Sequence, residues 1–191
     1  MTRDSGQSLL EFAMALPLLL VLVFGVIDIG AELLDEHIVT RLSREGANMI
    51  SRNTTLQDAL TAMKSMTATP VNFDDGTSKL ILSVFKRVGT TGAANYDKVV
   101  LYERVEYGGL PNSSALTTAG AGTFGGAPDY TAVNADNDAN LVATNFPANL
   151  LVTRGDFVYV TEIYSRHTFI TPLQNLLQTV FPTTLYSVAY F

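Results

Sequence analysis

A carboxylate lies at the edge of a long apolar segment near the N-terminus. Glu11 directly precedes Phe12 to Ile27, a run of 16 residues without a charge or a hydrogen-bonding side chain. An ionised carboxylate is costly in hydrocarbon, and ionisable residues at such positions are candidate functional groups that usually have a partner. The alternative is that Glu11 lies at the level of the lipid headgroups and contacts water.

The position of Glu11 after Gly6 points to a possible partner. Cleavage after Gly6 would leave Gln7 as the N-terminus, with Glu11 as the fifth residue of the mature chain. The new α-ammonium would lie beside the membrane, where the Glu11 carboxylate of a packed neighbour could pair with it. No Lys or Arg lies between residues 7 and 40 to replace this cation.

The apolar run itself predicts a membrane-spanning helix. At about 1.5 Å per residue, it covers roughly 24 Å of a hydrocarbon core about 30 Å thick. With the apolar residues that flank the run, we expect a transmembrane segment at about residues 9–30. Pro17 removes one backbone hydrogen bond inside this segment and is predicted to kink the helix. Arg3 before the run, and Asp28 and Glu32 at its end, favour a cytoplasmic N-terminus.

This region resembles the N-terminal signature of the TadE-like pseudopilins, which are minor-pilin-like proteins of tight-adherence (Flp, type IVb) pilus systems. The resemblance implies processing by a prepilin peptidase between Gly6 and Gln7, and a docking role for Glu11 during assembly. It also implies pilus assembly at the bacterial inner membrane with other pilins and pseudopilins, and no catalysis by this chain. The resemblance covers residues 6–34 and is carried by Gly6-Gln7, Glu11, Phe12-Ala13-Met14-Ala15-Leu16-Pro17-Leu18-Leu19-Leu20 and Gly25-Val26-Ile27-Asp28-Ile29-Gly30.

Composition argues against several other classes of function. The chain of 191 residues has a net charge of −6 and no basic run, which argues against nucleic acid as a partner. The absence of cysteine excludes disulfides, thiol nucleophiles and cysteine metal sites. His37 and His167 each lack a second histidine at metal-ligand spacing, and no G-x-S-x-G, P-loop or H-E-x-x-H motif occurs. We therefore expect no enzymatic activity and no cofactor.

Beyond the membrane segment, the pattern of apolar residues predicts an α+β domain. Apolar residues recur at close to helical spacing as far as residue 50, so we expect one helix over residues 7–52. Thr55 to Asp58 match a capping box that would begin a second, short helix. Apolar-rich and alternating segments predict antiparallel strands at residues 79–88, 98–107, 157–164 and 186–191.

The predicted architecture is pilin-like: a long N-terminal helix, membrane-spanning in its first half, packed on a small antiparallel β-sheet. The sheet must bury one face, and we expect the helix residues Leu34, Ile38 and Leu42 to cover it. The chain then divides into a leader peptide at 1–6, the helix at 7–52 and an exported α+β domain at 53–191. Residues 108–154 of that domain begin with a stretch rich in small and polar side chains, and we expect a flexible, irregular excursion.

One part of this excursion is a weak candidate for calcium binding. Its oxygen-bearing side chains alternate along the chain, as in half of an EF-hand loop. Ala139 replaces the glycine of that loop and Asn145 replaces its bidentate glutamate, so a solvated polar loop is the preferred interpretation and we expect no bound metal. The four candidate ligands are Asn134, Asp136, Asp138 and Asn140.

Two hypotheses for the function follow. The first is a pseudopilin or minor pilin that crosses the inner membrane once, with its N-terminus in the cytoplasm and its C-terminal domain outside. The second is a signal-anchored periplasmic binding domain that retains its leader and binds a ligand through residues 108–154. Ordinary secretory cleavage is disfavoured, because Glu11 and Pro17 disturb the apolar centre that a signal peptide needs. The chemical identity of the N-terminus separates the two hypotheses.

Overall fold

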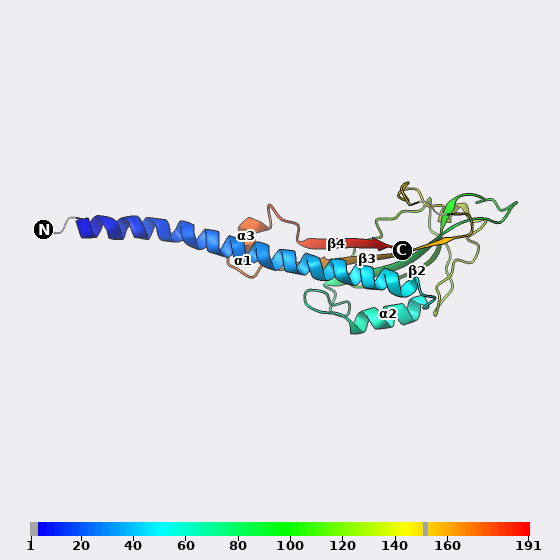
Figure 1. Cartoon of the computed structure of the whole chain (residues 1–191), viewed down its shortest axis with the longest axis horizontal. Helices are drawn as coiled ribbons and strands as arrows, with labels where there is room; N and C mark the ends of the chain where they lie inside the picture. Colours follow the sequence, from blue (N-terminus) through cyan, green and yellow to red (C-terminus); the bar gives the residue numbers. More distant parts are fainter. Residues whose placement is uncertain (1–3, 151–152) are drawn as a thin grey trace.

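One helix runs along the whole domain and continues far beyond it (Figure 1). This helix, α1 (Asp4–Ile50), has 47 residues and includes Pro17 without interruption. The computed structural model describes the backbone of residues 4–150 and 153–191, and side chains from Gln7 onward. The predicted helix over residues 7–52 is confirmed to within two residues at its C-terminal end.

The rest of the chain is built on a four-stranded antiparallel sheet. The sheet has the order β2-β1-β3-β4, with a bulge in β2 at Tyr102, opposite Val84 and Phe85 of β1. All four strands predicted from the sequence are present, so the α+β fold is confirmed. Their bounds are Ser78–Arg87 for β1, Val99–Gly108 for β2, Phe157–Arg166 for β3 and Thr184–Tyr190 for β4.

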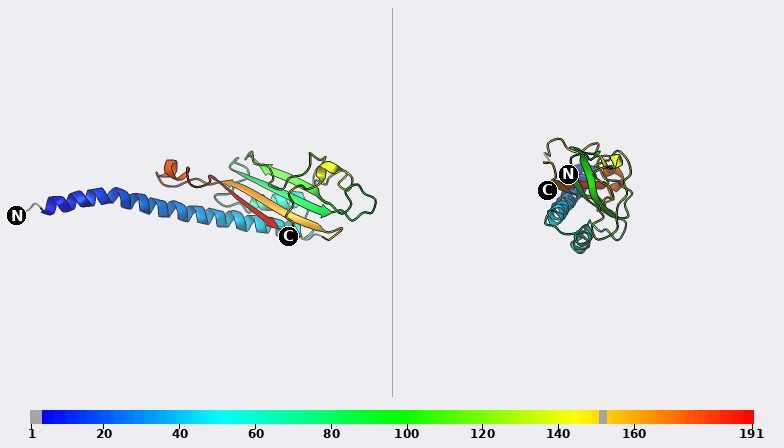
Figure 2. Two further views of the ribbon diagram at one scale, coloured as in Figure 1. Left: turned by 90° about the horizontal axis from the view of Figure 1, so that it is seen from above. Right: turned by 90° about the vertical axis from the view of Figure 1, so that its right-hand side faces the viewer.

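The central strand β1 is apolar along most of its length because both of its faces are covered. Leu80, Leu82 and Val84 belong to a core shared with α1 and with α2 (Leu56–Ser65). In the end-on view of Figure 2, the two helices lie together against one side of the sheet. The opposite face, which includes Ile81 and Ser83, is covered by the excursion. A strand covered on both faces has a nearly continuous run of apolar residues, as the sequence of β1 does.

The second half of α1 forms the helix side of this core. Val39, Leu42 and Ile50 are buried there. At Gly46 the helix approaches β3 so closely that an added Cβ atom would lie 2.8 Å from Thr161 Cγ2. Glycine at this position therefore permits the close packing of helix and sheet.

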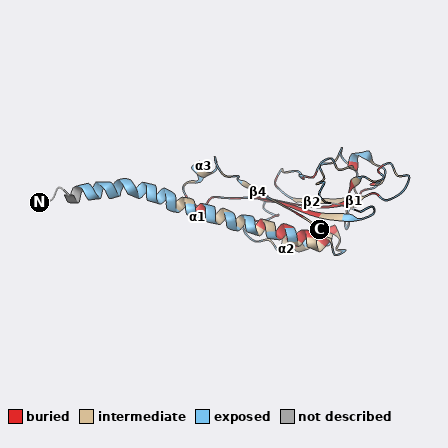
Figure 3. Ribbon diagram, turned by 45° about the horizontal axis from the view of Figure 1, so that its top comes forward, coloured by how far each residue is buried: buried red, intermediate tan, exposed pale blue. Residues whose placement is uncertain are grey.

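The predicted packing of Leu34 on the sheet is wrong. Leu34 is 60% exposed, Ile38 is partly buried, and Leu42 is only 5% exposed. Leu34 lies between Asp28 and Asp35 in the chain but on a different side of α1 from these two residues, which face the rest of the domain. Most of the buried residues of α1 lie towards its C-terminal end (Figure 3). Helical periodicity identifies an apolar face but not how much of that face another element covers.

The turn between the two helices follows the predicted capping chemistry. The backbone N–H of Asp58 donates to Thr55 Oγ1 at 3.1 Å, and Thr55 Oγ1 donates to Asp58 Oδ2 at 2.8 Å. The hydroxyl of Thr55 therefore satisfies one of the unpaired donors at the start of α2.

The excursion contains little regular structure, but it is packed on the sheet. Among its described residues it has one short helix, η1 (Ala139–Leu141), and its apolar residues Leu116, Ala132 and Leu141 join Phe85 and Val160 in a second core. The flexibility predicted for this segment stays a prediction.

A buried carboxylate holds the excursion in place. Glu162 of β3 accepts hydrogen bonds from Ser114 Oγ, from the backbone N–H of Ala115 at 2.8 Å and from Tyr186 Oη at 3.0 Å. The Arg104 guanidinium donates to the same Ser114 Oγ at 3.0 Å. Glu162 is fully buried, and its desolvation is offset by these donors.

The packing of α1 on the sheet predicts the effect of truncating Leu42. Leu42→Ala removes buried methyl groups and should lower the free energy of unfolding by about 2–5 kcal/mol. The matched control is Leu33→Ala, the same change at a site of α1 that is 62% exposed, where we expect a change within about 0.5 kcal/mol. Chemical denaturation of the full-length protein in detergent micelles, followed by circular dichroism, measures both. Equal losses for the two variants would contradict the packing described here.

Candidate functional site

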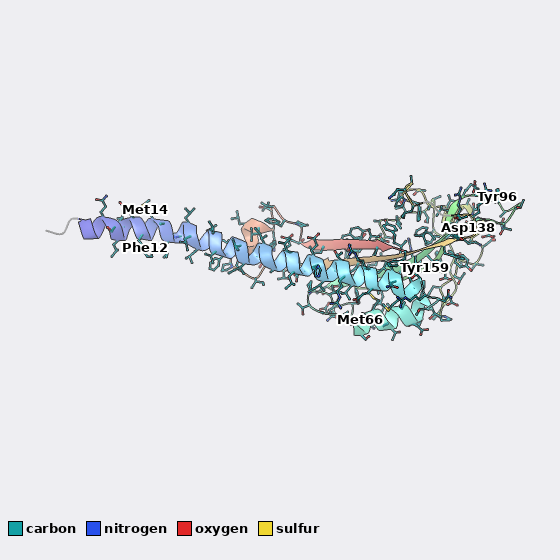
Figure 4. The ribbon with its side chains drawn as sticks, in the orientation of Figure 1. Phe12, Met14, Met66, Tyr96, Asp138 and Tyr159 are labelled. Carbon is teal, nitrogen blue, oxygen red and sulfur yellow. The ribbon has the colours of Figure 1, made fainter. Side chains whose placement is uncertain are left out.

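The first half of α1 exposes apolar side chains in every direction. All large apolar residues from Leu9 to Ile29 except the partly buried Phe24 are between 40% and 75% exposed. Figure 4 shows Phe12 and Met14 projecting from the helix with no other element beside them. By length and composition, α1 is the one helix among the described residues that could cross a membrane. The predicted span is therefore an apolar helical segment that no other described element covers, unlike the buried core helix of a globular domain.

Glu11 lies in this segment of α1, one helical turn after Gln7. Gln7 Nε2 donates to Glu11 Oε1 at 3.1 Å, and both side chains are exposed. This donor is a neutral amide, so the Glu11 carboxylate has no cationic partner among the described residues. Gly6 lies within α1 as well, so the bond between Gly6 and Gln7 belongs to a helical segment.

Pro17 lies about a turn and a half beyond Glu11, inside the apolar half of α1. The helix continues through it, and the kink predicted for this position stays a prediction. The structure thus places Gly6, Gln7, Glu11 and Pro17 on one helix, with no contact to the sheet domain.

The environment predicted for Asp28 from the sequence is wrong. We expected it to mark the end of the apolar run and the start of a water-exposed helix, but its side chain is fully buried. Asp28 Oδ1 accepts hydrogen bonds from the backbone N–H groups of Ile170 at 2.9 Å and Thr171 at 3.1 Å, and Oδ2 accepts one from Thr171 Oγ1. The connection between β3 and β4 therefore covers this carboxylate with three donors.

A second contact holds the same connection against α1. His167 Nδ1 lies 2.8 Å from Asp35 Oδ2, and the His167 ring packs edge-on against Phe169 with 4.9 Å between ring centroids. Asp35 and Asp28 are seven residues apart, which is two helical turns, so both face the connection. In the sequence, only the spacing of the two acidic residues indicates that they share one side of the helix. Their partners lie more than 130 residues further along the chain.

The predicted polar loop uses its oxygen atoms internally. Asp136 accepts from Lys86 Nζ at 2.9 Å and from Thr90 Oγ1 at 2.8 Å, and the hydrogen bond from Lys86 holds the pKa of this carboxyl below its usual value. Asp138 accepts from the backbone N–H of Asn140 at 2.9 Å, and Asn134 from Asn137 Nδ2 at 3.2 Å. No cluster of three or more His, Cys, Asp or Glu side chains fit for a metal occurs in the described part of the chain.

One cavity lies beside the C-terminal end of α1, far from Glu11. It has a volume of about 250 Å³, and its lining includes Tyr102, Phe157 and Tyr159 together with the carboxylates of Glu103 and Asp129. Burial raises the pKa of the Glu103 carboxyl, and the nearby charge of Asp129 adds to the shift. An apolar wall with carboxylates at one side fits a small cationic or amphipathic group.

The buried hydrogen bonds of Asp28 predict how the connection responds to mutation. Asp28→Ala leaves the backbone donors of Ile170 and Thr171 without an acceptor, at a cost of about 1–3 kcal/mol each if they stay buried. We therefore expect residues 168–172 to detach from α1 and to lose protection against amide hydrogen exchange, which mass spectrometry measures. Glu36→Ala, at an exposed site on the same helix, should leave the protection unchanged. Unchanged exchange in Asp28→Ala would mean that other contacts hold the connection.

Comparison with known proteins locates the similarity in the same part of the chain. Residues 6–48 match the family model described as TadE-like protein. No curated protein and no solved structure matches the chain. The match includes Glu11, Pro17 and Asp28 and ends within the part of α1 that packs on the sheet. The resemblance to the TadE-like proteins is thus confirmed over residues 6–48, which include most of the long N-terminal helix.

Proposed function

We propose that this chain is a pseudopilin-like subunit of a tight-adherence, type IVb pilus system. Its coarser identity as a Tad pilus-related protein rests on the TadE-like match and the apolar N-terminal helix. In the proposal, α1 anchors the chain in the bacterial inner membrane before assembly and then packs against other pilins and pseudopilins. The chain acts as a structural and assembly protein and not as an enzyme.

The observation that carries this proposal is the uncovered apolar surface of α1 between Leu9 and Ile29. Such a surface is stable in lipid or against other apolar helices, but not in water. A protein that only needed an anchor could use any apolar helix. This helix also places the carboxylate of Glu11 and Pro17, which has no backbone N–H to donate, within its apolar half, where neither adds to anchoring.

The electrostatics of Glu11 support a role in assembly. In the lone subunit the carboxylate can lie near the headgroups, with the Gln7 amide as its donor. In a bundle of packed helices the same carboxylate would be surrounded by apolar side chains, where an unpaired charge is expensive. Prepilin peptidase cleavage after Gly6 would create an α-ammonium at Gln7, and the ammonium of one subunit can neutralise Glu11 of the next.

The orientation follows from the two ends of the apolar segment. We place the leader peptide, residues 1–6, in the cytoplasm and the domain formed by residues 53–191 outside it. Acidic residues Glu32, Asp35 and Glu36 follow the span, whereas Arg3 precedes it. In this orientation, the domain contacts the pilus machinery on the outer side of the inner membrane.

A second candidate function is a signal-anchored periplasmic binding domain that retains its leader. The cavity near Tyr102 and Glu103 is the observation that favours it. This candidate requires an intact N-terminus and a ligand, whereas the pseudopilin requires a processed N-terminus and partner subunits.

The processing step predicts the mass of the mature protein. In cells with a matching prepilin peptidase, we expect the chain to begin at Gln7, and intact-mass or N-terminal sequencing of the membrane fraction detects this. Gly6→Val should slow the cut because a bulky side chain then occupies the position before the scissile bond. Ser5→Val, one position earlier, is the control for a general effect on the leader. Chains that keep Met1 beside an active peptidase would favour the anchored binding domain.

The role of Glu11 predicts a defect in assembly alone. Glu11→Gln keeps the shape of the side chain and removes its charge, so expression, membrane insertion and cleavage should stay near normal. Recovery of partner subunits by co-purification, and piliation, should be lost. Glu36→Gln, the same change outside the apolar segment, should preserve both. Normal pili in the Glu11→Gln strain would place this residue among the headgroups with no part in docking.

A further inference from the structure

The connection between β3 and β4 has an unusual surface. No charged residue occurs from Thr168 to the C-terminal Phe191. Within the connection, Ile170 is 71% exposed, Leu176 is 59% exposed and Val180 is 74% exposed. An uncharged surface segment with several large exposed apolar residues indicates contact with a partner or with lipid.

The contacts to α1 set the height of this connection along the helix. Asp28 directly follows the apolar run, and it is the residue that binds the backbone of Ile170 and Thr171. From Leu9 to Ile27, α1 rises by about 28 Å, close to the thickness of the hydrocarbon core. With this segment in the membrane, the connection lies at the outer boundary of the hydrocarbon.

The connection also stands out to the side of α1 at that height. Its helical turn, α3 (Gln174–Leu177), lies off the helix axis, beyond the end of the sheet that faces the membrane (Figure 2). An element placed there meets the same membrane surface through which α1 emerges.

The backbone of the connection suits this boundary. Gln178, Val180 and Phe181 donate their N–H groups to carbonyl groups of Gln174 and Leu177 at 2.9–3.0 Å. Internal pairing of the backbone lowers the cost of contact with lipid. The neighbouring polar side chains, Gln174, Asn175 and Gln178, are uncharged amides that can bind headgroups.

From these observations we propose that residues 168–183 form a second membrane contact, which inserts Ile170, Leu176 and Val180 into the outer half of the bilayer. The inference rests on the membrane anchoring in the proposed function. Two contacts at one membrane surface fix the rotation of α1 and the orientation of the domain, which a single helix leaves free. They also require that this connection leave the lipid when the subunit enters an assembly.

Lipid is the occupant that the structure favours. The exposed residues continue the apolar surface of α1 across the point where Asp28 joins the two segments. At that junction the Asp28 carboxylate is buried against the backbone N–H groups of Ile170 and Thr171 and the hydroxyl of Thr171. A second copy of the chain is the competing occupant, and the experiment below separates the two.

The sequence contains neither tryptophan nor cysteine, so one introduced tryptophan reports on one site. Val180→Trp tests the connection. Val133→Trp is its matched control, since Val133 is a valine of nearly equal exposure, 71%, in the excursion, a different part of the domain. Leu19→Trp reports on the membrane span. Each full-length variant is reconstituted at high lipid-to-protein ratio into phosphatidylethanolamine–phosphatidylglycerol vesicles, with and without bromine on the acyl chains.

We expect blue-shifted emission and strong quenching by brominated lipid for Val180→Trp and Leu19→Trp, and neither effect for Val133→Trp. Quenching of Leu19→Trp without quenching of Val180→Trp would overturn the second contact and leave the anchor intact. Blue-shifted but unquenched emission from Val180→Trp would mean that protein covers the site, which also overturns it. If Leu19→Trp is not quenched, the anchoring in the proposed function fails together with the second contact.

Discussion

A single unbroken helix has to satisfy two environments, and the rest of the structure follows from that constraint. The backbone of α1 pairs its own hydrogen bonds in either environment, so the helix itself needs no change where it leaves the membrane. Its side chains do change: most of those from Leu9 to Ile29 are apolar and exposed, and from Val39 onward one side of the helix is buried against the sheet. In the proposed membrane anchoring, the helix passes from lipid to protein between these segments, and Asp28 and Asp35 lie in that interval.

Buried charged and titratable groups mark the places where distant parts of the chain are joined. Asp28 joins α1 to the β3–β4 connection, His167 and Asp35 repeat that link, and Glu162 joins the sheet to the excursion. The carboxylates of Asp28 and Glu162 are each surrounded by hydrogen-bond donors, because an unsatisfied buried carboxylate would cost several kcal/mol. These junctions fix the position of each irregular segment on the domain. Apolar contacts alone specify such a position less precisely, because they do not depend on direction.

The arrangement separates two tasks along one axis. The N-terminal half of α1 carries the surface and the carboxylate proposed to act in the membrane and in assembly. The sheet domain keeps the other half of the helix rigid, through close packing at Gly46 and burial of Val39, Leu42 and Ile50. A subunit built in this way can lose its lipid contacts and gain helix contacts without unfolding its domain, because few contacts of the domain reach beyond Asp28.

Much of this protein was determined by its sequence alone. The unbroken apolar run, the helical period that follows it, the capping residue Thr55 and the alternation of the strands are local properties, and each appeared where expected. The tertiary structure decided what local pattern does not contain: that Leu34 stays exposed, and that the excursion packs on the second face of β1. It also decided that Asp28 is buried, since the donors that make burial possible lie 142 and 143 residues further along the chain. Burial of a charge depends on such remote partners, so only the folded chain reveals it.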